Sequence, residues 1–198
     1  MGIETRILQS REISEWVQSK VDGLSCPKYS TVKRARMAGA CWHVAIEHAQ
    51  AVVLLMEARL HGSALALVRS MWESLVRGMW LAYAASDEAV DRAGKDKFPN
   101  LGEQIVELEK PGRLPPGMLS EIKKEQWTRL NSYTHTGFQQ IGARLVPGGV
   151  GYNYSKEELV WVLQWADMVA LSSASSFANL AEDEGLASEC LAQMQTCA

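Results

Sequence analysis

The sequence predicts an all-α protein: an up-down helical bundle of four or five main helices plus several short helices. Apolar residues recur at helical intervals over five long stretches, and no run among the 198 residues shows the alternation of a long strand. Segments rich in glycine, proline or serine separate these stretches, as expected for turns between packed helices. With 47% hydrophobic residues the chain can build one sizeable core. We expect residues 1–185 to form a single domain and residues 186–198 a loosely ordered tail.

Three long helices are predicted in the first half of the chain. Apolar residues at helical spacing indicate an amphipathic helix over residues 4–22, and a second helix should run from Thr31 to Leu60. Residues 61–63 (His-Gly-Ser) then predict a break, because glycine suits the left-handed position after a helix and serine can cap the next one. A third helix is expected over residues 64–85, and the short connection makes it antiparallel to the second.

Two short helices are predicted next, each from a signal at its start. Ser86, Asp87 and Glu88 can start the first of them, which ends in the charged loop of residues 94–99. Asn100 and Glu103 have the spacing of a capping box, in which each side chain accepts a hydrogen bond from the other residue's backbone. That box should begin a helix that ends near Lys110, before a connection rich in proline and glycine.

The last part of the chain predicts two further helices. One should begin at Met118, run into residues 129–137 and resume after them. Residues 147–153 are rich in glycine and predict a loop or a small hairpin. Ser155 and Glu158 have the spacing of a second capping box, which should open the last long helix.

Composition and charge restrict the function. The formal net charge of −3 argues against a protein that coats nucleic acid, although one local basic patch could still admit RNA. The four cysteines form no Cys-x-x-Cys pair, which indicates reduced thiols rather than a zinc site or a disulfide scaffold. Residues 1–20 do not resemble a secretory signal, and the apolar stretch Leu159–Ala181 contains Asp167, which favours a buried helix over a membrane span. We therefore expect a cytoplasmic protein without membrane contact and without a cofactor.

The second predicted helix carries two groups of side chains that need a role. Lys33, Arg34 and Arg36 crowd its first turns; a solvated face is the simpler interpretation, and a contact with an anion or RNA is the alternative. His43 and Glu47 are four residues apart and hence neighbours on one face. Two ligands on one helix do not make a metal site, so we favour a hydrogen-bonded histidine at a packing face and no bound metal.

A charged pair borders the apolar stripe of the third predicted helix. Arg69 and Glu73 are one helical turn apart, and we expect them to be partly buried and matched by each other or by polar partners. An intrahelical salt bridge explains the pair by itself. The alternative is a supporting role in a functional site, because a second polar cluster further along the chain also needs neighbours inside the bundle.

That second cluster is the segment 129–137 (Arg-Leu-Asn-Ser-Tyr-Thr-His-Thr-Gly), which holds one of the four histidines. Cleavage of RNA without a metal needs a group that moves protons near neutral pH and a group that stabilises phosphate charge; His135 and Arg129 are of these types. Asn131 and Tyr133 are candidate orienting groups. Residues six apart lie about 240° apart around a helix, so a shared site would need a helix end, a kink or a second protomer.

The spacing of Arg129 and His135, with five residues between them, resembles the Arg-x(4–6)-His signature of the HEPN superfamily. The combination of Arg69 and Glu73 with the later Ser132–Gly137 is similar to uncharacterised bacterial all-α families that are grouped near HEPN. The similarity extends over roughly residues 40–180.

This resemblance implies a metal-independent RNase of toxin–antitoxin or phage-defence systems that works as a homodimer. It implies that His135 is the general acid and base, Arg129 the phosphate ligand and Asn131 their support. Leu130 stands directly after the arginine, where the family usually has a polar residue.

Two further hypotheses come from other classes of protein. His135 could be a buried histidine bonded to Glu73 or to a backbone carbonyl, and Arg129 the partner of a bundle carboxylate. The protein would then be a non-catalytic module that binds a cognate protein, of antitoxin, immunity or regulatory type, for which seven tryptophans and eight methionines offer contact surface. The third hypothesis is a metal-dependent bundle that uses His43, Glu47, Glu73 and His135, although the sequence lacks the paired Glu-x-x-His motifs of di-iron bundles.

Overall fold

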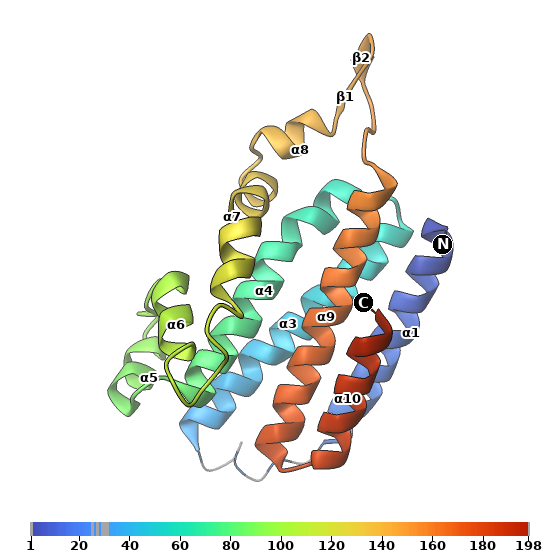
Figure 1. The fold of residues 1–198 in the computed structure, drawn as a ribbon. Helices are drawn as coiled ribbons and strands as arrows, with labels where there is room; N and C mark the ends of the chain where they lie inside the picture. The colour runs from blue at the N-terminus through green and yellow to red at the C-terminus, as the bar shows by residue number, and fades with distance from the viewer. Residues whose placement is uncertain (1, 25, 27, 29–31, 198) are drawn as a thin grey trace.

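The computed structural model describes residues 2–24, 26, 28 and 32–197 and shows an all-α bundle, as the sequence predicts (Figure 1). Four long helices run up and down beside one another, and a C-terminal helix packs against the last of them. These helices are α1 (Ile3–Asp22), α3 (Lys33–Glu57), α4 (His61–Tyr83), α9 (Lys156–Ala181) and α10 (Glu184–Cys197). α3 lies in the middle and packs against α1, α4 and α9.

Shorter elements cover α4 and extend from one end of the bundle. α6 and α7 pack against α4, and an arm made of α8 and a two-stranded hairpin projects beyond the long helices (Figure 1). The hairpin is antiparallel, with Leu145 opposite Val150. These elements are α5 (Asp87–Ala93), α6 (Leu101–Leu108), α7 (Ser120–Thr134), α8 (Phe138–Gly142), β1 (Leu145–Val146) and β2 (Gly149–Val150).

Large aromatic side chains fill the core. Trp42, Trp72 and Trp80 are each at most 1% exposed, and Trp72 makes an edge-on contact with Trp127 from α7. The Trp42 indole lies so close to α4 that a Cβ at Gly78 would be 2.3 Å from Trp42 Nε1. Glycine at this position therefore leaves room for the indole between α3 and α4.

The connection between α3 and α4 differs from its prediction. α4 begins at His61, before the predicted break ends, and the residue in the left-handed region is Arg59, with φ 58°. Gly62 lies in the first turn of α4, where a Cβ would be 2.9 Å from both Arg144 Nη2 and Tyr154 Oη. Gly62 thus permits Arg144 and Tyr154 to lie close to the first turn of α4. The sequence around Gly62 does not predict this contact.

The C-terminal segment is more ordered than predicted. Residues expected to form a loose tail belong to α10, whose Leu186 and Cys190 are buried in the core shared with α9. Leu186, Cys190 and Met194 are spaced by four residues, so they lie along one helical face. The structure replaces the expected tail with a packed helix.

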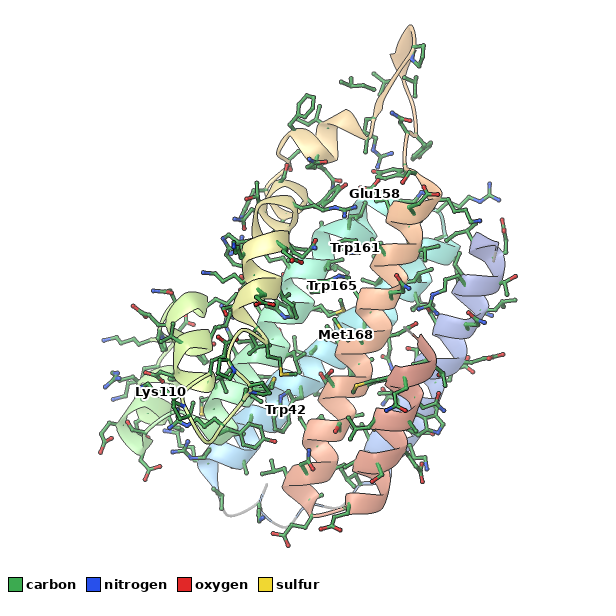
Figure 2. The ribbon with its side chains drawn as sticks, viewed as in Figure 1. Trp42, Lys110, Glu158, Trp161, Trp165 and Met168 are labelled. Atoms are coloured by element: carbon green, nitrogen blue, oxygen red, sulfur yellow. The ribbon has the colours of Figure 1, made fainter. Side chains whose placement is uncertain are left out.

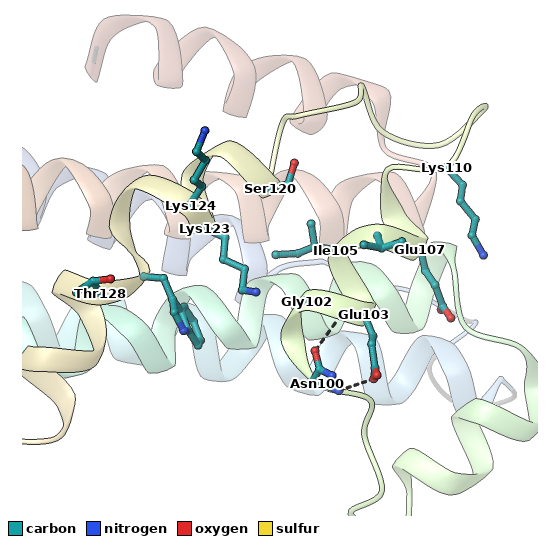
Figure 3. A pocket seen from close by; sticks show the side chains of 12 residues that line it. Asn100, Gly102, Glu103, Ile105, Glu107, Lys110, Ser120, Lys123, Lys124 and Thr128 are labelled. Carbon is teal, nitrogen blue, oxygen red and sulfur yellow. Dashed lines mark hydrogen bonds between the residues drawn. The ribbon is translucent and has the colours of Figure 1, made fainter.

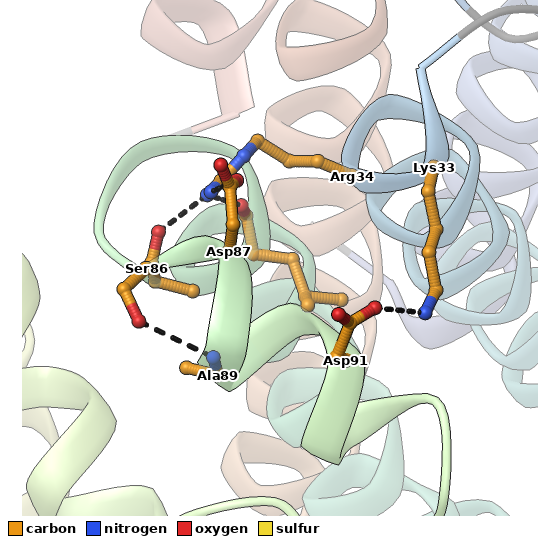
Figure 4. Close-up of polar contacts among 8 residues, drawn as sticks. Lys33, Arg34, Ser86, Asp87, Ala89 and Asp91 are labelled. Atoms are coloured by element: carbon orange, nitrogen blue, oxygen red, sulfur yellow. Dashed lines mark hydrogen bonds and ion pairs between the residues drawn. The ribbon is translucent and has the colours of Figure 1, made fainter.

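Basic residues at the start of α3 hold α5 in place (Figure 4). Lys33 forms an ion pair with Asp91, and Arg34 pairs with Asp87 and donates hydrogen bonds to two backbone oxygens at the end of α4. The Ser86 hydroxyl accepts a hydrogen bond from the backbone of Ala89 in the first turn of α5, which begins where the sequence predicts. An anion or RNA contact is therefore not needed to explain Lys33 and Arg34.

Among the described residues α3 is the helix long and apolar enough to cross a membrane, judged by length and composition alone. The sequence pointed instead to residues 159–181 in α9. In the structure many apolar side chains of α3, including Ala38 and Val52, are buried between α1, α4 and α9, whereas Val44 and Leu54 are exposed. The predicted first residue of this helix, Thr31, lies outside the described residues.

Candidate active site

α4 and α7 bring together polar residues from both segments that the sequence singled out. Arg69 and Glu73 lie one turn apart on α4, and Arg69 Nε donates to Glu73 Oε1 at 2.7 Å. α7 packs beside α4 and ends at Thr134, so that His135 reaches the same arginine. Arg69 Nη1 and His135 Nε2 are 2.6 Å apart. We refer to Arg69, Glu73 and His135 as the Arg69 cluster.

The turn after α7 presents His135 at the surface. The backbone N–H of His135 still donates a helical hydrogen bond to Asn131 O. The chain then turns, with Thr136 in the left-handed region at φ 55°. The Gly137 N–H donates to Ser132 O at 2.7 Å, and a Cβ at Gly137 would lie 2.6 Å from Ser132 Oγ. The turn therefore requires a residue without a side chain at position 137 and leaves the imidazole of His135 exposed.

The contact between Arg69 and His135 indicates which ring nitrogen carries the proton. A guanidinium group has only donors, so His135 Nε2 accepts the hydrogen bond and the proton of the neutral imidazole is on Nδ1. This assignment follows from the positions of the heavy atoms. A basic nitrogen beside a fixed cation can remove a proton from a substrate while the cation stabilises the negative charge that develops next to it.

The Arg69 guanidinium is fixed from several sides. Glu73 pairs with Arg69 through one carboxylate oxygen and with Arg77 through the other, at 3.1 Å. The guanidinium also lies over the ring of Trp127, 4.6 Å from its centroid. The side chains of Arg69 and Glu73 are 21% and 14% exposed. A planar cation held in this way keeps its remaining N–H groups aimed in a fixed direction.

Arg129 lies in a different cluster from His135. Its guanidinium stacks on Trp161 at 4.1 Å from the ring centroid, and its Nη2 is 3.2 Å from Glu158 Oε1. Both partners are near the start of α9 (Figure 2). The structure thus pairs Arg129 with a bundle carboxylate, as the alternative interpretation of this residue proposed. The separation follows from the six-residue spacing, which places the two side chains about 240° apart around a helix.

Tyr133 joins the same second cluster. Its ring is 2% exposed, and its hydroxyl donates a short hydrogen bond to Glu158. Burial, helped by this hydrogen bond to a carboxylate, raises the pKa of Tyr133 to about 12. The Glu158 side chain faces Tyr133 and Arg129, while the Ser155 hydroxyl accepts the Glu158 N–H at the start of α9. Of the predicted capping box, the hydrogen bond to the Ser155 hydroxyl is present, whereas the Glu158 carboxylate instead connects α9 to Arg129 and Tyr133 of α7.

The remaining predicted site residues lie outside both clusters. Asn131 Oδ1 is buried and has no hydrogen-bond partner within the described part of the chain. His43 and Glu47 are exposed on α3, so His43 is not at a packing face as we expected. Among the described residues no three His, Cys, Asp or Glu side chains form a group that could hold a metal ion.

Arg69 and Glu73 of the Arg69 cluster open into a groove that His135 does not line. Arg69, Glu73, Arg77 and Trp127 line a cavity of about 400 Å³ together with residues that precede α6. It adjoins a larger depression of about 780 Å³ between α6 and α7, and Trp127 lines both. Figure 3 shows the larger part, in which the predicted capping box of α6 is present. Its cations are Lys110, Lys123 and Lys124.

Sequence reasoning missed Arg77, Trp127 and the groove lysines. Arg77 carried a signal, because Arg69, Glu73 and Arg77 follow one another at four-residue intervals on one helical face. Lys123 and Trp127 have the same spacing, and the Lys123 ammonium lies 5.5 Å from the centroid of that ring. Nothing in the local sequence indicates that the two helices face each other at these positions.

The site residues fall within a segment that matches a known family model. The model described as "Family of unknown function (DUF6988)" matches residues 42–197. The chain belongs to this family. The matched segment begins within α3 and includes α4, α7 and the whole Arg69 cluster. Searches of curated proteins and of solved structures found no match.

Proposed function

We propose that this DUF6988 member is a HEPN-like, metal-independent RNase in which His135 moves the proton and Arg69, in place of Arg129, binds the phosphate. One observation carries the proposal: Arg69 Nη1 lies 2.6 Å from His135 Nε2 at an exposed position, with Glu73 holding the arginine. A base and a phosphate-binding cation are the two groups that cleavage by the neighbouring 2′-hydroxyl needs.

In the proposed reaction a phosphate of RNA takes up N–H groups of Arg69, including the one on Nη1 that His135 Nε2 accepts in the free protein, so the lone pair of Nε2 becomes available. His135 Nε2 accepts the proton of the 2′-hydroxyl, and the 2′-oxygen forms a bond to phosphorus. The bond from phosphorus to the 5′-oxygen breaks, and that oxygen takes a proton from solvent water, to which this exposed site is open. The hydroxide that remains removes the proton from His135 and restores the neutral imidazole. The products are a 2′,3′-cyclic phosphate and a 5′-hydroxyl end. Arg69 stabilises the negative charge of the phosphorane that forms on the way to these products.

The groove beside the cluster supports a nucleic-acid substrate. Lys110 and Lys124 have no ion pair recorded among the described residues, so their charge is available to phosphates. Two of the carboxylates nearby accept hydrogen bonds inside the protein, Glu103 from Asn100 N and Glu107 from Trp80 Nε1, while the exposed Asp96 also lines the smaller cavity. The three lysines of the larger depression outnumber its two glutamates, so a local excess of positive charge is compatible with the overall charge of −3.

The biological setting rests on the resemblance alone. On that ground we propose that the protein acts on RNA in the cytoplasm, as a homodimer, in a toxin–antitoxin or phage-defence system.

The test compares purified wild type with His135→Ala on a fluorescent RNA in the presence of EDTA. His43→Ala is the matched control, because His43 is an exposed histidine outside the cluster. We expect the wild type and the control to cleave and His135→Ala to lose about 10²- to 10⁴-fold in rate, the usual contribution of a general base. Cleavage by His135→Ala at the wild-type rate, or activity only with added metal, would refute the mechanism.

A non-catalytic module that binds a cognate protein is the second candidate, and the arm gives it a specific basis. Phe138 is 76% and Val150 83% exposed, and Tyr152, which follows the hairpin, is 68% exposed. Exposed apolar side chains gathered on one projection are typical of a protein contact. If the protein is inactive on RNA and copurifies with a partner that Phe138→Ser with Val150→Ser releases, this candidate replaces the RNase.

A further inference from the structure

A separate cavity of about 860 Å³ lies between α4, α9, α10 and the connection from α6 to α7. It shares no lining residue with the groove at the Arg69 cluster. Four of the eight methionines of the chain line it: Met79, Met118, Met168 and Met194. Methionine is flexible and polarisable and adapts to the shape of an apolar ligand, and the volume lies in the range of small-molecule sites.

Most polar groups of this cavity come from α9. Ser172, Ser175, Ser176 and Asn179 line it from this helix and Tyr83 from α4, and its lining includes no aspartate or glutamate. Its single formal charge is Arg113, an exposed residue in the connection between α6 and α7. Arg113 Nη1 donates to Glu107 O at 2.6 Å, which anchors the side chain and leaves other N–H groups for a ligand.

The outer wall of the cavity is held in shape without a ligand. The backbone N–H groups of Leu119 and Ser120 donate to Glu109 Oε1 at 2.6 and 2.9 Å. These hydrogen bonds join the two ends of the connection between α6 and α7. The Leu114 N–H donates to Leu108 O at 3.0 Å. A preformed wall reduces the ordering that a ligand must bring about when it binds.

We propose that this cavity binds an amphipathic carboxylate. The apolar body of the ligand lies among the methionines, and its carboxylate pairs with Arg113. The lone cation beside an apolar trough that lacks carboxylates is complementary to this chemistry: an anion paired with arginine gains charge-assisted hydrogen bonds, and an apolar chain leaves water.

The test measures binding of dodecanoate and of dodecanol, which has the same chain without the charge, by isothermal titration calorimetry below their aggregation concentrations. The variants are Arg113→Gln, Ser172→Phe, which places a ring in the cavity, and Arg36→Gln, an exposed arginine on α3 that does not line the cavity, as the control. Circular dichroism establishes that each variant is folded.

We expect the wild type and Arg36→Gln to bind one dodecanoate, and Arg113→Gln to bind it about tenfold more weakly, with dodecanol binding unchanged. Ser172→Phe should bind neither. Equal affinities for the two probes, unaffected by Arg113→Gln, would overturn the assignment of a carboxylate. Absence of binding, together with a concentration-dependent dimer that Ser172→Phe abolishes, would overturn it in favour of a contact between two copies.

Discussion

At the scale of single residues, Glu73 has the most demanding position, since its one carboxylate pairs with both Arg69 and Arg77. Glu73→Gln would leave two partly buried cations without their counter-charge. We expect it to lower the free energy of unfolding by about 1–3 kcal/mol, the usual cost of leaving such groups unmatched. Urea unfolding measures this, with the exposed Glu125→Gln on α7 as the control. Equal stability of the two variants would contradict the role given to Glu73.

Tyr133 gives a prediction for alkaline pH. Its pKa is raised from 10.0 to about 12 in the folded protein, so the unfolded chain loses this proton first as pH rises. The stabilisation that the neutral phenol provides is complete below pH 10 and is lost between pH 10 and about 12. Wild type should therefore lose more free energy of unfolding than Tyr133→Phe between pH 9 and pH 11. Parallel losses in the two proteins would show that Tyr133 does not titrate in this way.

Residue types at the candidate site were predictable from the sequence, but their pairing was not. Arg69, Glu73 and His135 were each singled out from spacing and chemistry. The contact between Arg69 and His135 depends on the position of α7 along the axis of α4. This position is set by the packing of the two helices and not by the local sequence pattern. The same packing places Arg129 beside Glu158, while the six-residue spacing on the helix turns it away from His135.

At the scale of elements, the contact between α3 and α4 depends on Gly78. A methyl group there would overlap the Trp42 indole, which is fully buried and unable to move aside. Gly78→Ala should destabilise the protein by about 1–3 kcal/mol through overpacking, although alanine favours helices by about 1 kcal/mol. Gly142→Ala in α8 is the control, because its Cβ would meet only Phe138 at 3.5 Å. Thermal unfolding that ranks the two variants in the opposite order would refute this packing.

Helices with a clear periodic stripe and a capping signal were predicted well, and this includes α5 and α6, which begin as Ser86 and Asn100 indicate. Two features were not predicted, the early start of α4 and the helix α10. α4 begins at His61, and its first turn contains Gly62, beside which Arg144 and Tyr154 from distant segments lie close. α10 forms because α9 offers it a surface on which Leu186 and Cys190 are buried.

At the scale of the whole molecule, a buried ion pair ties the first long helix to the last. Arg6 of α1 and Asp167 of α9 are in contact, Ser10 donates to the same carboxylate, and both charged side chains are at most 4% exposed. Asp167→Asn should cost about 3–5 kcal/mol, because it leaves Arg6 buried without a counter-charge. Replacing both by apolar residues, as in Arg6→Met with Asp167→Leu, should restore most of the loss. A double variant less stable than Asp167→Asn in urea would contradict the explanation.

The proposed function depends on Arg69 as the phosphate ligand of a metal-independent RNase. The most direct measurement is the RNA cleavage rate in EDTA of Arg69→Ala beside Arg129→Ala, well below both melting temperatures. We expect Arg69→Ala to lose about 10²- to 10³-fold, as on removal of one transition-state donor. Arg129→Ala should lower only the melting temperature, because Arg129 binds Glu158 and Trp161. An active Arg69→Ala together with an inactive, folded Arg129→Ala would contradict the assignment.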